Sequence, residues 1–229
     1  MRTLESLVKR SGGFDKLKKR YTCCPHSKDE LIEIIEERIK NEGVDCDLND
    51  IDTSVITDMS QLFENFRKFK GDVSQWDVSN VENMELMFFD CRKFNCDLSN
   101  WDVSRVTNMY GMFFNCFNFN GDLSKWDVSS CTVFQRMFYE CRNFNSDLSM
   151  WNVSNADDFS AMFYECRKFN SDLSKWKTGK ARYFDNMFHY CSAFDSDLSG
   201  WDTNNAYIFY NFAEACPINK TSKMPKFEN

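Results

Sequence analysis

The sequence predicts a repeat solenoid of seven coils, and three observations predict it. Tryptophan recurs every 25 residues, at Trp76, Trp101, Trp126, Trp151, Trp176 and Trp201. Two columns of phenylalanine have the same period: Phe63, Phe88, Phe113, Phe138, Phe163 and Phe188, then Phe69, Phe94, Phe119, Phe144, Phe169 and Phe194. A cysteine column follows at Cys91, Cys116, Cys141, Cys166, Cys191 and Cys216. A strict period is typical of a solenoid, in which each repeat packs on its neighbours and like residues stack on like.

Each 25-residue coil is expected to contain one short parallel strand and one helical or 3₁₀ turn. In the segment D-L-S-x-W-D-V-S, Trp and Val lie two residues apart, which predicts a strand with both side chains pointing inward. The segment V-x-N-M-x-x-M-F-x-x-C-x-x-F has apolar residues three and four apart, which predicts a turn of helix that closes the coil. Residues 47–54 share this phase, with Ile51 in the Trp position, and as the first coil they bring the total to seven.

An N-terminal helical cap is predicted over residues 1–45. Ser27 and Glu30 form a capping box, which predicts a helix from there to about Glu42, and Gly43 is suited to end it. We expect this helix to cover the first coil of a solenoid that extends over residues 46–216. Upstream, Leu4, Leu7, Val8, Phe14 and Leu17 predict one or two further short helices.

The C-terminal tail, residues 217–229, lies beyond the last coil. It is polar, so we expect it to be partly disordered, although Phe227 offers an apolar ring that could fold back onto the last coil.

Composition and charge exclude several classes of protein. Twenty-three Phe, 11 Cys and six Trp against eight Gly and three Pro exclude a disordered or linker-like chain. The net charge is −7, and because residues 1–28 carry eight basic and two acidic residues, the body is strongly acidic. An acidic body argues against nucleic-acid binding, which depends on phosphate neutralisation. No apolar run is long enough for a membrane span, and the N-terminus lacks the apolar region of a signal peptide. The expected location is therefore cytoplasmic, or the cell surface if an export signal was removed.

The repeated motif L-x-x-W-x-V-S-x-V-x-x-M-x-x-M-F-x-x-C-x-x-F resembles the BspA-like leucine-rich repeats. More narrowly, it resembles the 25-residue lipoprotein-associated surface-protein repeat of Mycoplasma, Bacteroidetes and some viruses and phages. The resemblance covers about residues 47–216. It implies a right-handed, leucine-rich-repeat-like solenoid and a role in surface attachment or protein binding.

The sequence offers little chemistry for catalysis, metals or cofactors. His26 and His189 are the two histidines and lie far apart in the repeat, and no nucleophile or phosphate-binding motif is present, so we predict no enzyme activity. The cluster at 23–26 has metal-ligand residue types but no second CxxC, so no metal or cofactor is predicted. The Asp column that begins at Asp72 suggests calcium, but turn hydrogen bonds explain it better. The cysteine column is expected to hold buried, reduced thiols, although stacked neighbours could pair.

The variable positions of the strand face are the predicted partner-binding surface, because packing fixes the inward columns and leaves the outward ones free. They are Gln75, Asp77, Asn100, Asp102, Lys125, Asp127, Met150, Asn152, Lys175, Lys177 and Lys180. Coil 6 is the most informative place, because Lys177 replaces the acidic residue of the earlier coils and lies within a basic stretch. Such a change could steer a charged partner, or it could be drift in a decaying repeat.

A second-choice surface is an outward aromatic row near Arg92, Arg142 and Arg167. The row consists of Phe89, Phe114, Tyr139 and Tyr164. Aromatic and Arg side chains are typical interface anchors, but these rings could equally lie half-buried against the next coil.

These observations favour a non-enzymatic protein-binding scaffold that presents its strand face to a partner protein of unknown identity. One alternative is a cell-surface adhesin whose export signal is missing or unconventional. Another is a viral or phage protein that binds and inhibits a host factor.

Overall fold

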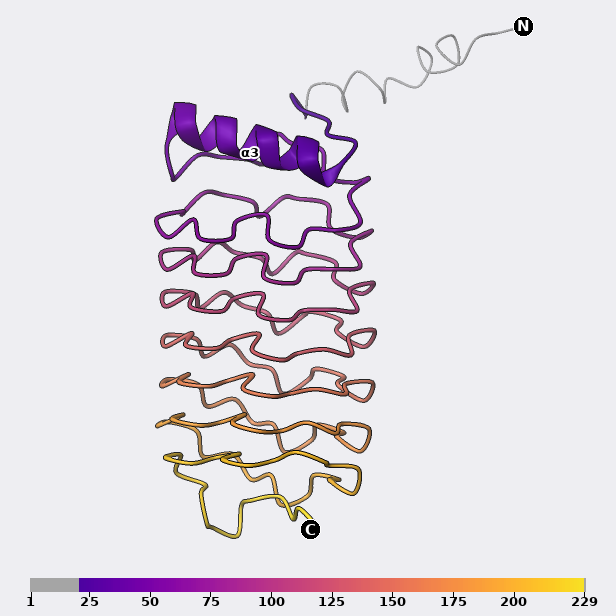
Figure 1. Cartoon of the computed structure of the whole chain (residues 1–229), viewed down its shortest axis with the longest axis vertical. Coiled ribbons are helices and arrows are strands. Elements are labelled where there is room, and N and C mark those ends of the chain that lie inside the picture. The colour runs from indigo at the N-terminus through magenta and orange to yellow at the C-terminus, as the bar shows by residue number, and fades with distance from the viewer. Residues whose placement is uncertain (1–20, 229) are drawn as a thin grey trace, which may run out of the picture.

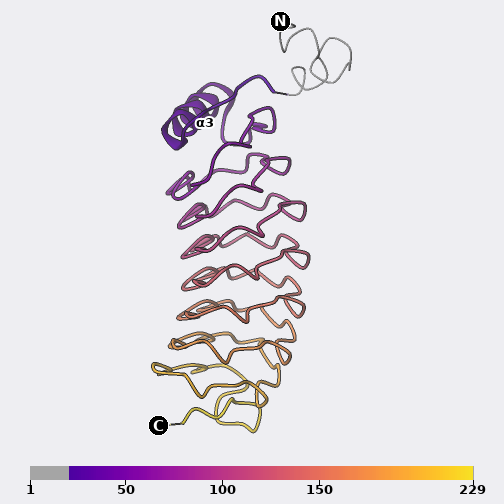
Figure 2. The same cartoon turned by 90° about the vertical axis from the view of Figure 1, so that its right-hand side faces the viewer.

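The computed structural model describes residues 21–228, which form a stack of flattened coils with one helix, α3 (Lys28–Glu42), at the N-terminal end (Figure 1). Successive coils are linked by seven isolated parallel bridges between residues 25 apart. One joins Asp47 to Asp72, and the other six connect, in order, Asp58, Asn83, Asn108, Val133, Asp158, Tyr183 and Ile208. The spatial offset between coils therefore equals the period of the sequence. Coil 1 begins at Asp47 and coil 2 at Asp72, and α3 and the C-terminus lie at opposite ends of the stack (Figure 2).

The bridged segment of each coil is the segment for which a helical or 3₁₀ turn was predicted, and that prediction is wrong. In coil 2, alternate N–H groups donate to carbonyls of coil 3 at 2.8–3.0 Å, from Met84, Leu86, Phe88 and Asp90. The residues between them make local bonds instead, as when Phe89 N–H donates to the Leu86 carbonyl at 3.1 Å. A helix cannot propagate through this segment because Leu86 and Asp90 have positive φ angles, 52° and 58°.

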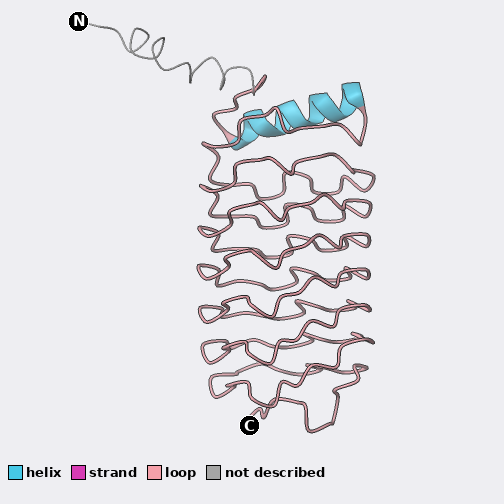
Figure 3. Ribbon diagram, turned by 180° about the vertical axis from the view of Figure 1, so that it is seen from behind, coloured by secondary structure: helices cyan, strands magenta, loops and turns pink. Residues whose placement is uncertain are grey.

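The D-L-S-x-W-D-V-S segment was predicted to be the strand, and this prediction is also wrong. It forms two consecutive turns, in which Trp76 N–H donates to the Val73 carbonyl and Val81 N–H to the Val78 carbonyl, at 3.1 and 2.9 Å. The Asp side chains explain the difference, because they accept hydrogen bonds from nearby backbone N–H groups, and these bonds compete with strand pairing. The part of the chain that the structure describes contains no regular strand, and its coils consist of turns and isolated bridges (Figure 3).

The Trp column points inward, as the sequence predicts, and it also links the coils. Trp126 is 3% exposed and stacks on Trp101 and Trp151, each with ring centroids 6.5 Å away. Its indole Nε1–H donates to the Leu98 carbonyl of the preceding coil at 3.0 Å. The same bond recurs at every Trp of the column, so a side chain connects successive coils where no backbone ladder does.

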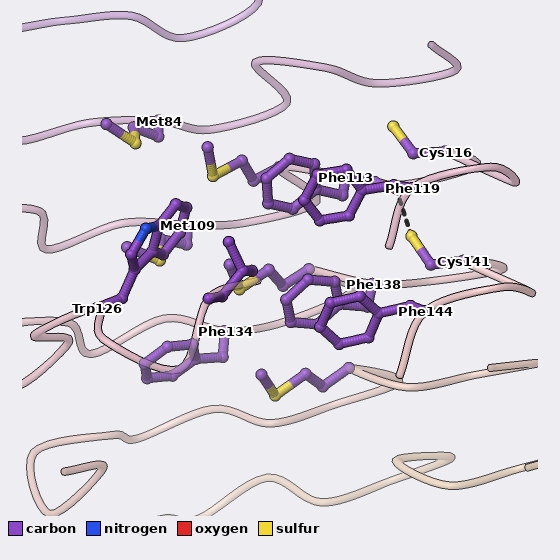
Figure 4. Close-up of a cluster of buried hydrophobic side chains, with 14 of the residues drawn as sticks. Met84, Met109, Phe113, Cys116, Phe119, Trp126, Phe134, Phe138, Cys141 and Phe144 are labelled. Carbon is purple, nitrogen blue, oxygen red and sulfur yellow. Dashed lines mark hydrogen bonds between the residues drawn. The ribbon is translucent and has the colours of Figure 1, made fainter. Parts of the chain in front are cut away.

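The two Phe columns fill the centre of each coil (Figure 4). Phe113 and Phe119 stack within coil 3 at 4.1 Å, and Phe113 stacks on Phe138 of the next coil at 5.7 Å. The cysteine column lies beside them with its thiols bonded to backbone, since Cys141 Sγ donates to the Phe113 carbonyl at 2.9 Å. The core is therefore a set of parallel columns, and each coil depends on its two neighbours for burial.

α3 covers the first coil, as expected. The Ser27 side chain accepts the Glu30 N–H at 3.2 Å, and the Glu30 carboxylate accepts the His26 N–H at 2.7 Å. The helix buries Leu31 and Ile35 within the same apolar cluster as Leu48, Ile51 and Leu62 of coil 1.

Polar contacts fix α3 on that coil. Arg38 forms an ion pair with Asp50 at 3.1 Å and donates to the Asp47 carbonyl at 2.8 Å. The further helices predicted from Leu4 to Leu17 lie outside the described residues.

The tail is folded onto the last coil, so the expectation of partial disorder is wrong for its described part, which ends at residue 228. The Phe227 ring stacks on Phe209 at 4.5 Å and meets Phe212 edge-on at 5.1 Å. The Leu198 N–H donates to the Lys223 carbonyl at 2.8 Å, where an eighth coil would otherwise provide the acceptor. The apolar ring outweighs the polar residues around it because it covers core that the last coil would expose.

Candidate functional site

The candidate site is the surface formed by the exposed residues of the two consecutive turns in each coil. We call this surface the turn face. It takes the place of the predicted strand face, and all eleven predicted partner-binding residues on it are exposed: Gln75, Asp77, Asn100, Asp102, Lys125, Asp127, Met150, Asn152, Lys175, Lys177 and Lys180. Because the positions of ten of them repeat every 25 residues, the stacked coils bring these ten together in two rows along one side of the molecule, and Lys180 follows the second row in coil 6.

All but one of the turns on this surface are closed by a side-chain oxygen that accepts a backbone N–H two residues later. In the first turn of coil 4, the Asp122 carboxylate accepts the Ser124 N–H at 2.9 Å. That bond lowers the pKa of Asp122, chiefly because it stabilises the charged carboxylate. The same arrangement recurs along the Asp column, at Asp72, Asp97, Asp147, Asp172 and Asp197. Turn closure is thus the structural role of these carboxylates, in agreement with the turn hydrogen bonds expected from the sequence.

In every coil except coil 6, the second turn is closed in the same way by the row that contains Asp77. The acceptors are Asp52, Asp77, Asp102, Asp127, Asn152 and Asp202. Sequence reasoning assigned this row to partner binding and missed its role in the turns. The Ser two residues after each of the earlier acceptors was the available signal.

Coil 6 breaks the second row because Lys177 stands where the other coils have Asp or Asn. An ammonium group has no lone pair to offer, so it cannot accept the backbone N–H two residues later. That N–H belongs to Gly179, and it has no hydrogen-bond partner in the part of the chain that the structure describes. The flanking coils keep the bond, with Ser154 N–H donating to Asn152 at 3.3 Å and Asn204 N–H to Asp202 at 3.1 Å.

The structure separates the basic residues of coil 6 into two open hollows. Lys175 lines a hollow with Asp147 and Asp172, so its charge faces carboxylates. Lys177 and Lys180 line another hollow of about 410 Å³, together with Gly179, Gly200 and Asp202. The basic stretch that the sequence treats as one patch is therefore two sites with different surroundings.

The comparisons with known proteins find one family. The model of the family described as "Mycoplasma protein of unknown function, DUF285" matches residues 36–141 and 120–224, which together cover most of the chain. The chain belongs to the DUF285 family. No curated protein and no solved structure matched it.

The aromatic row of this DUF285 chain, predicted as the second-choice surface, forms a continuous stack. The half-buried rings of Phe89, Phe114, Tyr139 and Tyr164 follow one another with centroids 4.3–5.0 Å apart. Burial raises the pKa of Tyr139 to about 12. These rings cover one another, which is the alternative to an interface that the sequence analysis left open.

The arginines near the row are paired within the protein. Arg92 bonds to the buried carboxylate of Asp90 at 2.7 Å, and Arg142 and Arg167 bond to Glu165 at 3.5 and 2.9 Å. Arg92 and Arg142 also lie over the Phe117 ring at 5.3 and 4.8 Å. Their charges are therefore engaged along this edge of the DUF285 coils.

The remaining motifs are placed as follows. In the 23–26 cluster, the backbone of Cys23 forms a parallel β-bridge with Ile51, and Cys24 is exposed. Among residues 21–228, no group of three or more His, Cys, Asp or Glu could hold a metal ion, and α3 is too short and too polar to cross a membrane. Sequence reasoning missed Tyr190, Tyr207 and Tyr210, which are exposed at the C-terminal end of the stack.

Proposed function

We propose that this protein is a non-enzymatic protein-binding scaffold that presents its turn face to a partner protein. One observation carries the proposal: the backbone of the turn face repeats from coil to coil, while its exposed side chains differ. At the position between the Ser and the Trp that recur in these coils, coils 2 to 7 have Gln75, Asn100, Lys125, Met150, Lys175 and Gly200.

Packing does not account for this variation, since the Trp, Phe and Cys columns are the same from coil 2 to coil 6 and the variable side chains point to solvent. Met150 is 79% exposed, an unusual position for a large apolar side chain in the middle of a polar row. A rigid, elongated surface with a distinct chemical character at each coil is well suited to recognising a protein.

A right-handed, leucine-rich-repeat-like coil of the BspA-like class is part of the same proposal. It is supported by the L-x-x-W-x-V-S motif, in which Trp and Val point inward, and by the stacking of like residues. In such a solenoid the turn face would be continuous from coil to coil.

The test places a photoreactive amino acid at Met150 on the turn face, and at Arg136 on the bridged side as the matched control, since both positions are exposed. We expect an adduct with one protein from position 150 and none from position 136. The partner, once purified, should bind the native chain, and Met150→Glu should weaken that binding at least tenfold, or ~1.4 kcal/mol.

An adduct from position 136 alone would contradict the proposal and place binding on the bridged side. The identity of the adduct also separates the alternatives. An extracellular host protein would indicate an adhesin, and an intracellular host factor would indicate an inhibitor.

A further inference from the structure

Coil 6 departs from the repeat at one exposed position of the turn face, and the departure leaves a backbone donor without an acceptor. In six coils an Asp or Asn oxygen accepts the N–H two residues later in the second turn. In coil 6 the equivalent side chain is Lys177, and the N–H of half-buried Gly179 is unpaired within residues 21–228. The Gly179 N–H can therefore donate a hydrogen bond to an oxygen from outside the described chain.

The surroundings of Gly179 favour a negative charge. Lys177 and Lys180 are both exposed and line the same open hollow. Lys180 is held by a hydrogen bond from its Nζ to Asn155 Oδ1 at 2.7 Å. Lys177 makes no ion pair or side-chain hydrogen bond with the described part of the chain, so its charge is available to a ligand.

The neighbouring coil limits the size and charge of that ligand. The Asp202 carboxylate lies beside Gly179, so close that a Cβ on that residue would meet Asp202 Oδ2 at 2.5 Å. Asp202 repels any anion at this place, and the repulsion grows with the charge of the ligand, so a carboxylate with a single charge is favoured over a multiply charged anion. The missing acceptor is itself a carboxylate in most of the other coils, which favours the same ligand.

We propose that a carboxylate from an acidic peptide segment of the partner completes the second turn of coil 6. Its oxygen accepts the Gly179 N–H, as Asp127 accepts the Ser129 N–H in coil 4, and its charge pairs with Lys177, with Lys180 beside it. This inference rests on the proposed function, because it names the chemistry of the partner at one coil of the turn face.

Binding of a ligand to the unpaired Gly179 N–H can be measured directly by NMR, from the chemical shift of its amide proton. The chain has eight glycines, so a ¹⁵N-glycine-labelled sample gives few amide signals, and Gly43 and Gly111 serve as internal controls because their N–H groups are bonded to Ile39 and Gln135 carbonyls. The probe is a blocked hexaglutamate peptide, with hexaglutamine and inorganic phosphate as comparisons. We expect hexaglutamate to cause a saturable downfield shift of the Gly179 amide proton, with no shift at Gly43 or Gly111 and none with hexaglutamine.

A substitution that restores the repeat provides the second measurement. Lys177→Asp supplies the acceptor from within the chain, so the Gly179 amide should already be shifted downfield without peptide and hexaglutamate affinity should fall at least tenfold. Lys168→Asp, an equal change of charge at an exposed residue away from the turn face, should leave that affinity within twofold. Because Asp is the residue at this position in five of the other six coils, the variant is expected to fold, and the dispersion of the glycine signals reports whether it does.

Three results would overturn the inference: no shift at Gly179, an equal shift with phosphate, or equal losses from Lys177→Asp and Lys168→Asp. If the Met150 adduct forms but Gly179 does not respond to hexaglutamate, the proposed function stands and this inference fails. If Gly179 responds but no adduct forms on the turn face, the carboxylate site stands and the proposed function fails.

Discussion

Trp126→Ala should destabilise the protein by ~3–5 kcal/mol, a cost set by the cavity it leaves. Trp126 is 3% exposed and fills the space between Trp101 and Trp151 in the middle of the stack. The lost indole bond adds little, since the Leu98 carbonyl that accepts it also accepts the Trp101 N–H at 3.1 Å and keeps a partner. Trp126→Phe retains most of the burial and removes that bond, so it should cost only about 0.5–1.5 kcal/mol from the bond, plus a small packing loss.

Urea unfolding and hydrogen exchange together measure this effect. The damage should be local, because each coil contacts only its neighbours. Close to the cavity, the Phe113 N–H donates to the Met137 carbonyl and the Phe138 N–H to the Met162 carbonyl, and both amide protons should exchange faster in the variant. The amide proton of Phe63 in coil 1 should exchange at nearly the same rate as before. A loss of less than 1 kcal/mol for Trp126→Ala, or uniform faster exchange in every coil, would refute the account of a column core with local stability.

Two further predictions concern thiols and acid. Burial raises the pKa of Cys116, Cys141 and Cys166, so these thiols should resist alkylation in the native protein, while exposed Cys24 reacts first. After denaturation and alkylation without reductant, mass spectrometry should show all 11 thiols modified. A smaller number of modified thiols would instead indicate disulfides. The pKa of Asp122 is lowered by its bond from Ser124 N–H, as in the other coils, so this stability is present above the unfolded pKa of about 3.9 and is lost as the pH falls through the folded value. Thermal melts should therefore show stability falling below about pH 4, and Asp122→Asn, which keeps the acceptor without the charge, should reduce that fall; a melting temperature that is flat down to pH 2 would contradict it.

The sequence predicts the period and the inward columns because both follow from side-chain chemistry repeated at one spacing. Trp, Phe and Cys at fixed positions require like residues to stack, and Trp126, Phe113 and Cys141 are buried as that reasoning requires. The capping box at Ser27 likewise predicts α3, since its hydrogen bonds depend on residues only three or four apart.

The backbone path within a coil could not be predicted, because two conformations place the same residues inward. Inward Trp76 and Val78 satisfy a strand and also the pair of turns that the structure contains. The turns prevail because Asp72 and Asp77 bind nearby N–H groups, a competition that periodicity does not reveal. The bridged segment was mistaken for a helix because spacings of three and four also arise from successive turns with residues at positive φ, such as Leu86.

The candidate site was found only in part for a related reason. Exposed residues were chosen by their variation, which identified Lys175 and Lys177 but gave no means to separate them. The separation depends on neighbouring coils, since Lys175 faces Asp172 while Lys177 lies beside the unpaired N–H of Gly179. A donor without an acceptor is visible only when the same turn is compared across several coils.

That comparison also answers the view that coil 6 is a decaying repeat. Trp176 is as buried as its counterparts and stacks on Trp151 and Trp201 at 6.4 and 6.1 Å. Thr178, in the place of Val, is 1% exposed and donates its hydroxyl to the Asp202 carbonyl at 2.8 Å, so the change adds a bond to the next coil. Coil 6 thus keeps its core and gives up one exposed turn bond, worth about 0.5–1.5 kcal/mol. Random decay would damage inward and outward positions alike, whereas here the loss is confined to the surface and leaves a positive charge beside a free donor.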